Sequence, residues 1–253
     1  MSECLISRRS SGNSKILNLD KLSYLTSAES KLSGELTGNI SNEVSTYDVK
    51  VGGTKIFSVV NRVPELLGIT QLKLACTSIG NNGLRGCTGL TSLDLPASTS
   101  VGGYAFYKCT DLTSLDLPSC TYIGDDAMFL CSSITSINLP VCTYIGVNGL
   151  CGCTGLTSLD LPSCTYIGVN GLYGCTGLTS LDLPSCTYIG NDGLCGCTGL
   201  AQLTIGSSIQ TIIANAFEDT KSGIIININR AQGTVSGAPW GAANAVIHWT
   251  GDA

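Results

Sequence analysis

A ten-residue string recurs along this chain at intervals of 22 residues. The string CTGLTSLDLP begins at Cys87, Cys153 and Cys175, and close variants begin at Cys109, Cys131 and Cys197. A degenerate copy from Leu66 precedes them, and a trailing copy with one inserted residue follows them. A repeat of this length predicts a solenoid, in which each copy forms one coil and stacks on its neighbours.

Large apolar residues keep the same places in every copy. Leu90, Leu93 and Leu95 have apolar counterparts every 22 residues, and so do Ile79 and Leu84. The spacing Leu-x-x-Leu-x-Leu, with Cys or Asn at a set distance, is the leucine-rich-repeat pattern. One coil buries about five such side chains, worth about 7–15 kcal/mol, whereas ordering its residues costs about 30 kcal/mol. A single coil therefore cannot fold alone.

The Leu-x-Leu segment of each copy predicts a short strand. Ser92 and Asp94 alternate with buried leucines and are expected to point outward, and the proline two residues after each Asp ends the strand. No stretch of useful length shows a 3.6-residue period. The predicted fold is a leucine-rich-repeat solenoid: a β-rich, right-handed coil of 22-residue repeats with little α-helix, capped at both ends.

The order SLDLP, TYIG, GL and C within each copy, with Phe106 and Phe217 at matching places, resembles the BspA-like leucine-rich-repeat family. These are bacterial and protist repeat proteins, often on cell surfaces, and the resemblance covers about residues 66–220. The central copies depart from the family pattern, since they are one residue shorter and carry Cys and Leu in place of Val and Phe. The segment Ile224–Trp249 resembles an end piece of some such proteins, including prophage-encoded ones. The resemblance implies adhesion or recognition and supplies no catalytic residue.

The chain divides into three parts. Residues 1–65 are expected to form an N-terminal cap or a small attachment module, residues 66–220 the solenoid, and residues 221–253 a C-terminal β cap. Within the first part, Glu43–Val60 predicts two strands around a Gly-Gly turn, and Leu19–Leu32 is either a short helix or an irregular repeat. In the last part, Trp240 and Trp249 are expected to seal the end of the core, with a contact surface as the alternative.

Most of the 14 cysteines fall in the repeat columns. A small buried thiol fits the places where other repeats have Asn, Val or Ser, so free buried thiols are the favoured interpretation. Disulfides between stacked coils are the alternative, since a strand spacing of about 4.8 Å lies within the Cα separation that a disulfide allows. A zinc site is disfavoured, because a Cys-x-Cys pair points its thiols to different faces and no histidine lies near.

Charge and motifs exclude several functions. The net charge of -5 divides into about +2 for residues 1–75 and -7 for the rest, which argues against nucleic acid as a partner. His248 is the single histidine, and no phosphate loop or cofactor motif occurs. We therefore expect no catalytic residue, no metal and no cofactor. No apolar run reaches 18 residues, so no membrane span is expected.

Two outward stripes are candidate binding surfaces. The first is a polar face suited to a basic, cationic or hydroxyl-rich ligand, although a solvated face is the simpler interpretation; it comprises Ser92, Asp94, Ser114, Asp116, Ser136, Asn138, Ser158, Asp160, Ser180 and Asp182. The second is an aromatic ladder that either meets sugars or proteins or only covers the coil edge, and it comprises Tyr122, Tyr144, Tyr166 and Tyr188.

The favoured hypothesis is a non-catalytic recognition or adhesion protein that presents a repeat face to a glycan or protein on a cell or matrix surface. The alternative is a structural spacer or a prophage tail-associated protein. The expected location is the cell surface, the extracellular space or a virion. No signal peptide is visible at the N-terminus, so a cytoplasmic location stays open.

Overall fold

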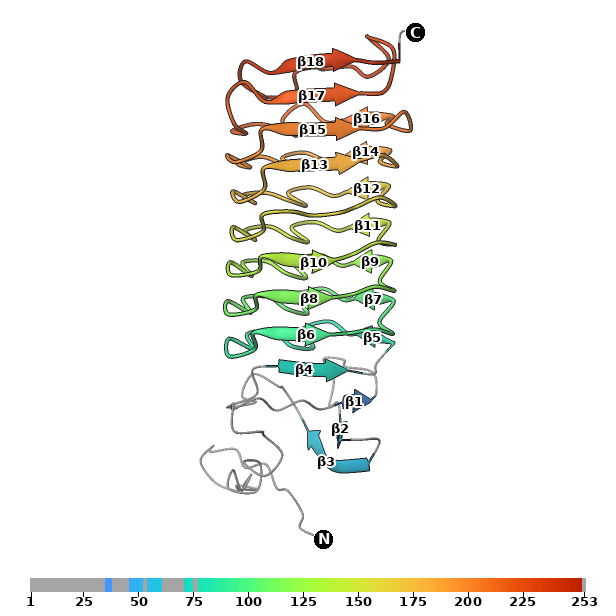
Figure 1. Ribbon diagram of the computed structural model, residues 1–253, viewed down its shortest axis with the longest axis vertical. Helices are drawn as coiled ribbons and strands as arrows, with labels where there is room; N and C mark the ends of the chain where they lie inside the picture. The colour runs from blue at the N-terminus through green and yellow to red at the C-terminus, as the bar shows by residue number, and fades with distance from the viewer. Residues whose placement is uncertain (1–34, 38–45, 52–53, 61–70, 75–76, 252–253) are drawn as a thin grey trace.

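The computed structural model describes residues 35–37, 46–51, 54–60, 71–74 and 77–251, with side chains from residue 77 onward. The described part of the chain winds into a stack of similar coils that runs from residues 71–74 to residues 246–249 (Figure 1). The coils follow one another at the predicted 22-residue interval, as the register between Ser92 and Ser114 shows. No α-helix occurs among the described residues. The predicted leucine-rich-repeat solenoid is therefore confirmed.

Parallel strands from successive coils run along two sides of the stack. On one side they form two separate sheets, which we count together as the first sheet. The strands of the first sheet are β4 (Gln71–Leu74), β6 (Ser92–Asp94), β8 (Ser114–Asp116) and β10 (Ser136–Asn138), continued after a gap by β13 (Ser180–Leu183), β15 (Gln202–Ile205), β17 (Ile225–Ile228) and β18 (Val246–Trp249). The strands of the second are β5 (Ser78–Ile79), β7 (Ser100–Val101), β9 (Tyr122–Ile123), β11 (Tyr144–Ile145), β12 (Tyr166–Ile167), β14 (Tyr188–Ile189) and β16 (Thr211–Ile212).

One coil interrupts the first sheet. Residues 158–160 form no regular strand, and the only bridge there joins Asp160 to Asp182. The string CTGLTSLDLPSCTYIG is the same in this coil and in the next one, which does form β13. The prediction of a strand in every Leu-x-Leu segment is therefore wrong for this coil, and the cause lies outside the local sequence.

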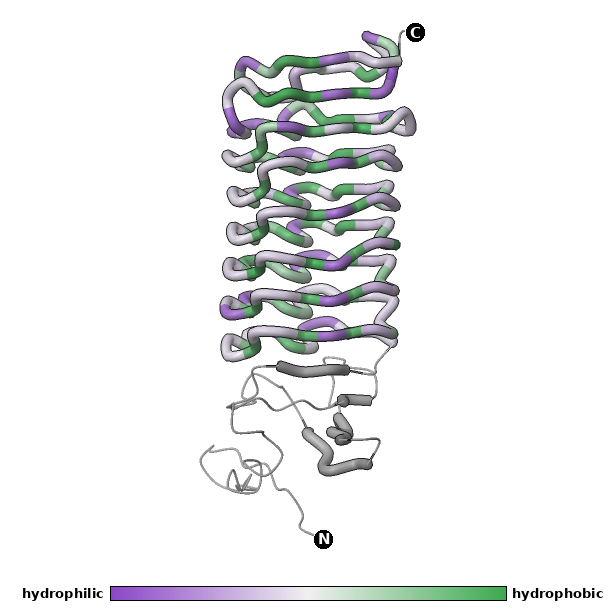
Figure 2. The backbone as a smooth tube through the Cα atoms, viewed as in Figure 1, coloured by the Kyte–Doolittle hydropathy of each residue, from purple (hydrophilic) through white to green (hydrophobic). Residues whose placement is uncertain are grey.

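The core is a continuous row of apolar side chains inside the stack. Leu95, Leu117, Leu161 and Leu183, for example, are fully buried or nearly so. Figure 2 shows the resulting alternation of hydrophobic and hydrophilic positions along each coil. Close stacking also explains one glycine column, because a Cβ on Gly168 would lie 2.8 Å from the carbonyl carbon of Gly146 in the preceding coil.

The turn after the second sheet contains two residues per coil with left-handed backbone. The first is Asn or Asp in most coils, such as Asn82 (φ 56°) and Asn148 (φ 52°), and the second is mostly Gly, such as Gly86 (φ 72°). These residue types tolerate a positive φ. Tyr104 (φ 57°) occupies the first position in one coil. The second position holds three further exceptions, Lys108, Leu130 and Asp219, with φ of 57°, 60° and 53°.

Strands close both ends of the stack. At the N-terminal end, β1 (Glu35–Thr37) pairs with β4, and β2 (Thr46–Val51) and β3 (Thr54–Val60) form the predicted antiparallel pair. The segment Leu19–Leu32 lies outside the described residues. At the C-terminal end, β17 and β18 extend the first sheet in parallel, as predicted for strands in this region. Trp240 is fully buried and meets Phe217 edge-on at 5.8 Å, while Trp249 is half-buried against Trp240. Sealing by Trp240 is therefore confirmed.

The twelve described cysteines lie in buried positions and form no disulfide with one another. In one column the thiol donates to a carbonyl of the preceding coil, as Cys109 does to Leu84 at 3.1 Å and Cys131 to Phe106 at 3.0 Å. In a second column the acceptor is the carbonyl two residues ahead, as for Cys120 and Tyr122 at 3.3 Å. These contacts satisfy the weak thiol donor without breaking the apolar core.

Candidate ligand-binding face

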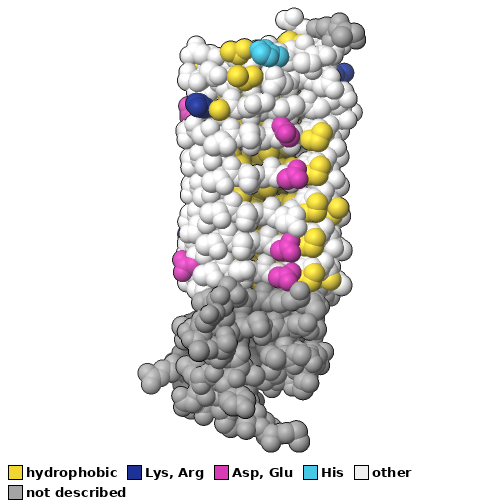
Figure 3. Space-filling view, viewed as in Figure 1, with side chains coloured by type: hydrophobic (Ala, Val, Ile, Leu, Met, Phe, Trp, Pro, Cys, Tyr) yellow, Lys and Arg dark blue, Asp and Glu magenta, His cyan; other side chains and the backbone are white. Residues whose placement is uncertain are grey.

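The first sheet turns one polar face to solvent, which we name the strand face and define by the ten Ser, Asp and Asn residues predicted above. In β8, buried Leu115 separates Ser114 from exposed Asp116, and in β10 buried Ile137 separates Ser136 from Asn138. This alternation follows from the two-residue period of a strand. Figure 3 shows acidic side chains in a line along the stack on this face.

The acidic column is aligned across neighbouring coils. Asp94 is in register with Asp116, and Asp116 with Asn138. The amide of Asn138 donates a 2.7 Å hydrogen bond to the carboxylate of Asp116. Carboxylates about 5 Å apart in water repel each other by about 0.8 kcal/mol. Compared with an aspartate at the same position, Asn138 therefore avoids the repulsion with Asp116 and adds a hydrogen bond. The sequence located Asn138 in the column, but its contact requires the register of the sheet.

The alignment is incomplete toward the C-terminal end. Asp160 bridges to Asp182, whereas the pairing that joins Asp116 to Asn138 is not continued from Asn138 to Asp160, because residues 158–160 are not a strand. Ser158, Asp160, Ser180 and Asp182 are all exposed. The structure therefore places the predicted residues on one side of the stack but groups them into two blocks.

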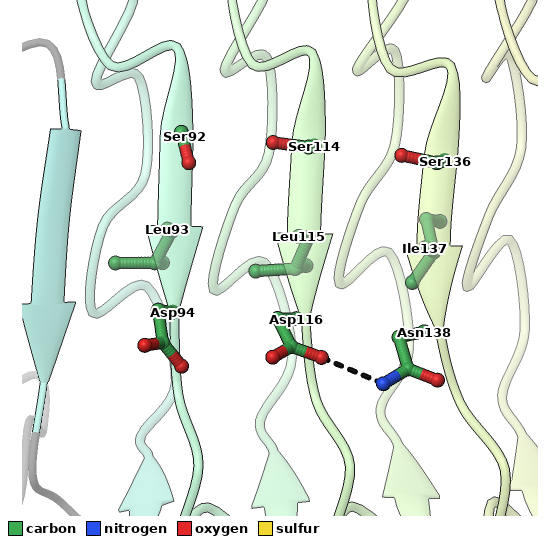
Figure 4. A pocket seen from close by; sticks show the side chains of 9 residues that line it. All are labelled: Ser92, Leu93, Asp94, Ser114, Leu115, Asp116, Ser136, Ile137 and Asn138. Atoms are coloured by element: carbon green, nitrogen blue, oxygen red, sulfur yellow. Dashed lines mark hydrogen bonds between the residues drawn. The ribbon is translucent and has the colours of Figure 1, made fainter.

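A shallow hollow lies across the first block. It has a volume of about 320 Å³ and is lined by Ser92, Leu93, Asp94, Ser114, Leu115, Asp116, Ser136, Ile137 and Asn138. Figure 4 shows the serines on one side of the apolar residues and the Asp and Asn side chains on the other. A ligand lying here would meet hydroxyl groups along one margin and carboxylates and an amide along the other, while the side chains of Leu93, Leu115 and Ile137 between them are buried.

The same face continues over the last three strands, which sequence analysis did not include. Thr204, Asn227 and His248 follow in register along the acidic column. His248 is exposed at the end of this row next to Asn227. A histidine acting as a catalytic base needs a nucleophilic side chain beside it, and its neighbour in the row is an amide. Thr204 keeps the 22-residue count but carries no charge or amide, whereas the insertion in the trailing copy breaks the count before Asn227 and His248.

The tyrosine ladder lies on the second sheet. Successive rings of Tyr122, Tyr144, Tyr166 and Tyr188 stack in parallel, with centroids 4.9, 4.8 and 4.8 Å apart. Tyr122 is 42% exposed and the other three are half-buried. Stacking covers the ring faces, so the ladder presents mainly ring edges and hydroxyl groups to solvent. Burial beside Tyr166 and Tyr122 raises the pKa of Tyr144 above its ordinary value.

The described residues offer little support for metal binding or for nucleophilic catalysis. No three His, Cys, Asp or Glu side chains of residues 77–251 lie close enough together to hold a metal ion. Burial raises the pKa of the Cys120 and Cys186 thiols to about 11 and those of Cys142 and Cys164 to about 12. Such thiols stay protonated at neutral pH and are poor nucleophiles. No helix in the described part of the chain is long and apolar enough to cross a membrane.

Comparison with known proteins agrees with the repeat architecture. A family model described as the BspA type leucine rich repeat region matches residues 67–168 and 125–236, with six copies. No curated protein matches the chain.

Several solved structures match this chain. A leucine-rich repeat protein from Bacteroides ovatus superposes with a TM-score of 0.52 at 18% identity, covering 98% of this chain and 71% of that one. The pneumococcal vaccine antigen PcpA has a TM-score of 0.34 at 14% identity, covering 72% and 68%. A leucine rich cell surface protein from Faecalibacterium prausnitzii has a TM-score of 0.31 at 15% identity, covering 96% and 94%. The first likeness supports the fold alone. The other two TM-scores are too low to support any structural argument.

Proposed function

Because the chain belongs to the BspA-type leucine-rich-repeat family, we propose that it is a non-catalytic recognition protein whose strand face holds a glycan or protein on a cell or matrix surface. The hollow over β6, β8 and β10 is the observation that carries this proposal. It combines carboxylates, hydroxyl groups and an amide in fixed rows, which suits a ligand with several hydroxyl or amino groups. The protein acts at the cell surface, outside the cell or on a virion.

The rigidity of the stack supports the same proposal. The strand face is part of a sheet fixed by hydrogen bonds between coils, and buried leucines hold each strand in place. A binding surface built in this way loses little conformational entropy when a ligand binds. Repetition also lets one extended ligand meet the same groups in several coils, so that weak contacts add up.

The test is binding of the purified protein to an array of glycans and extracellular-matrix proteins. The variant Asp94→Asn/Asp116→Asn/Asp160→Asn/Asp182→Asn removes the carboxylates of the strand face while keeping their shape. A matched control removes four negative charges elsewhere on the surface: Asp111→Asn/Asp125→Asn/Glu218→Gln/Asp219→Asn. Asn is suitable at position 125, because Asn81 accepts the equivalent backbone hydrogen bond in an earlier coil.

The proposal expects specific binding that the strand-face variant loses and the control variant keeps. Equal loss in both variants would mean that the overall negative charge, and not this face, attracts the ligand. Full binding by the strand-face variant would exclude the strand face. No binding to any glycan or matrix protein at micromolar concentration would favour the second candidate.

That second candidate is a structural spacer, such as a prophage tail component, and the even stacking of the coils favours it. The tyrosine rings keep a spacing of 4.8–4.9 Å over four coils, so each coil adds the same increment of length. Deletion of residues 164–185 removes one complete copy of the repeat. A spacer loses function in proportion to the length removed, whereas a recognition protein keeps its ligand, since the hollow lies in other coils.

A further inference from the structure

Three residues in the turns break the repeat's own pattern. The first left-handed position is Asn or Asp in the coils before and after, as at Asn82 and Asp126, but is Tyr104 between them. The second is Gly at residues 86, 152, 174 and 196 but is Lys108 and Leu130 in the coils between. A side chain at such a φ is crowded by the following carbonyl. Strained residues of this kind concentrate at functional sites.

The only two cations between residues 77 and 220 lie at the same place. These are Arg85 and Lys108. The guanidinium carbon of Arg85 lies 4.6 Å from the centre of the Tyr107 ring and 5.3 Å from that of Tyr104. The Lys108 ammonium lies 5.2 Å from the Tyr107 ring centre. We name Arg85, Tyr104, Tyr107, Lys108 and Phe129 the aromatic–cation patch.

The patch is ordered by its own contacts. Tyr107 stacks on Phe129 at 5.4 Å with an interplanar angle of 7°. The guanidinium of Arg85 donates a 2.9 Å hydrogen bond to the side-chain oxygen of Asn82, which holds it over the rings. Cation–π contacts and this bond fix the arginine in advance, so a ligand would bind it with little loss of side-chain entropy.

The patch is also accessible. Arg85 and Lys108 are exposed, Tyr104 is 38% exposed, and Tyr107 and Phe129 are half-buried. It lies in the turns after the second sheet and shares no residue with the strand face.

Local charge distinguishes the patch from the rest of the stack. Residues 77–220 contain ten acidic residues and two basic ones. One acidic residue, Asp126, adjoins the patch and is already engaged: the Tyr104 hydroxyl hydrogen-bonds to it, and the Asn148 amide donates to it at 3.2 Å. Two cations and one carboxylate therefore contact the rings of the patch. An anion would therefore find favourable charge here and repulsion over most of the remaining coils.

We propose that the aromatic–cation patch binds an acidic saccharide. The carboxylate of the sugar pairs with Arg85 and Lys108, because a guanidinium binds carboxylates through two parallel hydrogen bonds. The apolar C–H face of the same sugar lies against Tyr104 and Phe129. An acidic peptide offers carboxylates but no flat C–H surface, and a neutral sugar makes no use of the cations. This site is independent of the strand face, so either proposal can fail alone.

The test is titration calorimetry of the full chain with three oligomers at about 50 mM and 150 mM salt: oligogalacturonate, a neutral galactose oligomer of equal length, and poly-glutamate. Oligogalacturonate should bind, and the other two should bind at least about tenfold more weakly, since each lacks one of the two recognised features. Arg85→Gln and Lys108→Gln should each weaken oligogalacturonate binding by about tenfold. Lys221→Gln removes an exposed cation outside the patch and should change nothing.

A ring substitution and the strand-face variant complete the experiment. Phe129→Leu keeps the apolar volume but removes the flat ring, and it should weaken the uronate while leaving poly-glutamate unaffected. The strand-face variant with its four Asp→Asn substitutions should bind oligogalacturonate as tightly as the unmodified chain does. The proposal is overturned by any of three results: no uronate binding at millimolar ligand, the same loss in Lys221→Gln as in Arg85→Gln, or poly-glutamate binding as tight as that of the uronate.

Discussion

Raising the pH above 9 should unfold this protein steeply, because its core contains many protonated thiols. Burial raises the pKa of every member of one set of well-buried cysteines, to about 11 for Cys120 and Cys186 and to about 12 for Cys142, Cys164 and Cys197. The same cause raises the pKa of Cys131, Cys153 and Cys175 further. In the unfolded chain these thiols titrate near their ordinary value of about 8.5–9.

The sign and size of the effect follow from proton linkage. Below about pH 8 both states hold their thiol protons, and stability is independent of these groups. Between about pH 9 and 11 the unfolded chain releases protons that the folded chain keeps, so each cysteine lowers the free energy of unfolding by about 1.4 kcal/mol per pH unit. The eight cysteines together lower it by about 11 kcal/mol per unit. A typical total stability of about 5–15 kcal/mol would therefore be lost between about pH 9 and 10.5.

The assay is urea unfolding followed by circular dichroism from pH 7 to 10.5, with excess reductant to prevent oxidation. A cysteine variant isolates the contribution of these thiols from that of other groups. Cys142→Ala/Cys164→Ala should have a slope smaller by about 2.7 kcal/mol per pH unit, although it is less stable at pH 7 because it loses buried volume. A free energy of unfolding that stays flat to pH 10.5, or an unchanged slope in the variant, would refute the claim that these thiols are buried and protonated.

Three further changes test the packing. Asn138→Asp replaces the hydrogen bond to Asp116 by a repulsion and should destabilise the fold by about 1–2 kcal/mol. In thermal unfolding, the loss of stability should be smaller at about 1 M salt than at about 0.05 M. A loss of stability that does not depend on salt would contradict an electrostatic cause. Gly168→Ala places a methyl group against the preceding coil and should destabilise the fold by about 1–3 kcal/mol. As the control, Gly89→Ala adds a methyl group that meets no atom within 4 Å and should change the urea midpoint little. Equal effects of the two substitutions would disprove the close approach. Trp240→Ala should cost about 3–5 kcal/mol and speed hydrogen exchange in β17 and β18 before the central coils, and uniform exchange along the stack would show that Trp240 does not hold the end.

The strand face illustrates how far sequence reasoning reaches. Ser114 and Asp116 flank a leucine in a repeat of fixed length, and those two facts place them outward and in line with their counterparts. The hollow they help to line depends on how the small serine side chains and the Asp and Asn side chains lie across three neighbouring coils, which is a matter of three-dimensional packing. The aromatic–cation patch was missed for a related reason. Its rings and cations lie in an irregular turn, where no simple period tells which way Tyr104 or Arg85 points.

The sequence by itself determined the solenoid, the coil length, the buried columns and the outward residues, because a strict period forces equivalent residues into equivalent environments. Only the tertiary structure decided which equivalent segments differ. Residues 158–160 and 180–182 share one local sequence, yet only the second forms a strand, so their shared sequence does not decide which of them pairs. The tertiary structure also decided that the tyrosine ring faces cover one another. Local sequence sets what a residue prefers, whereas contacts between coils determine which preference is satisfied.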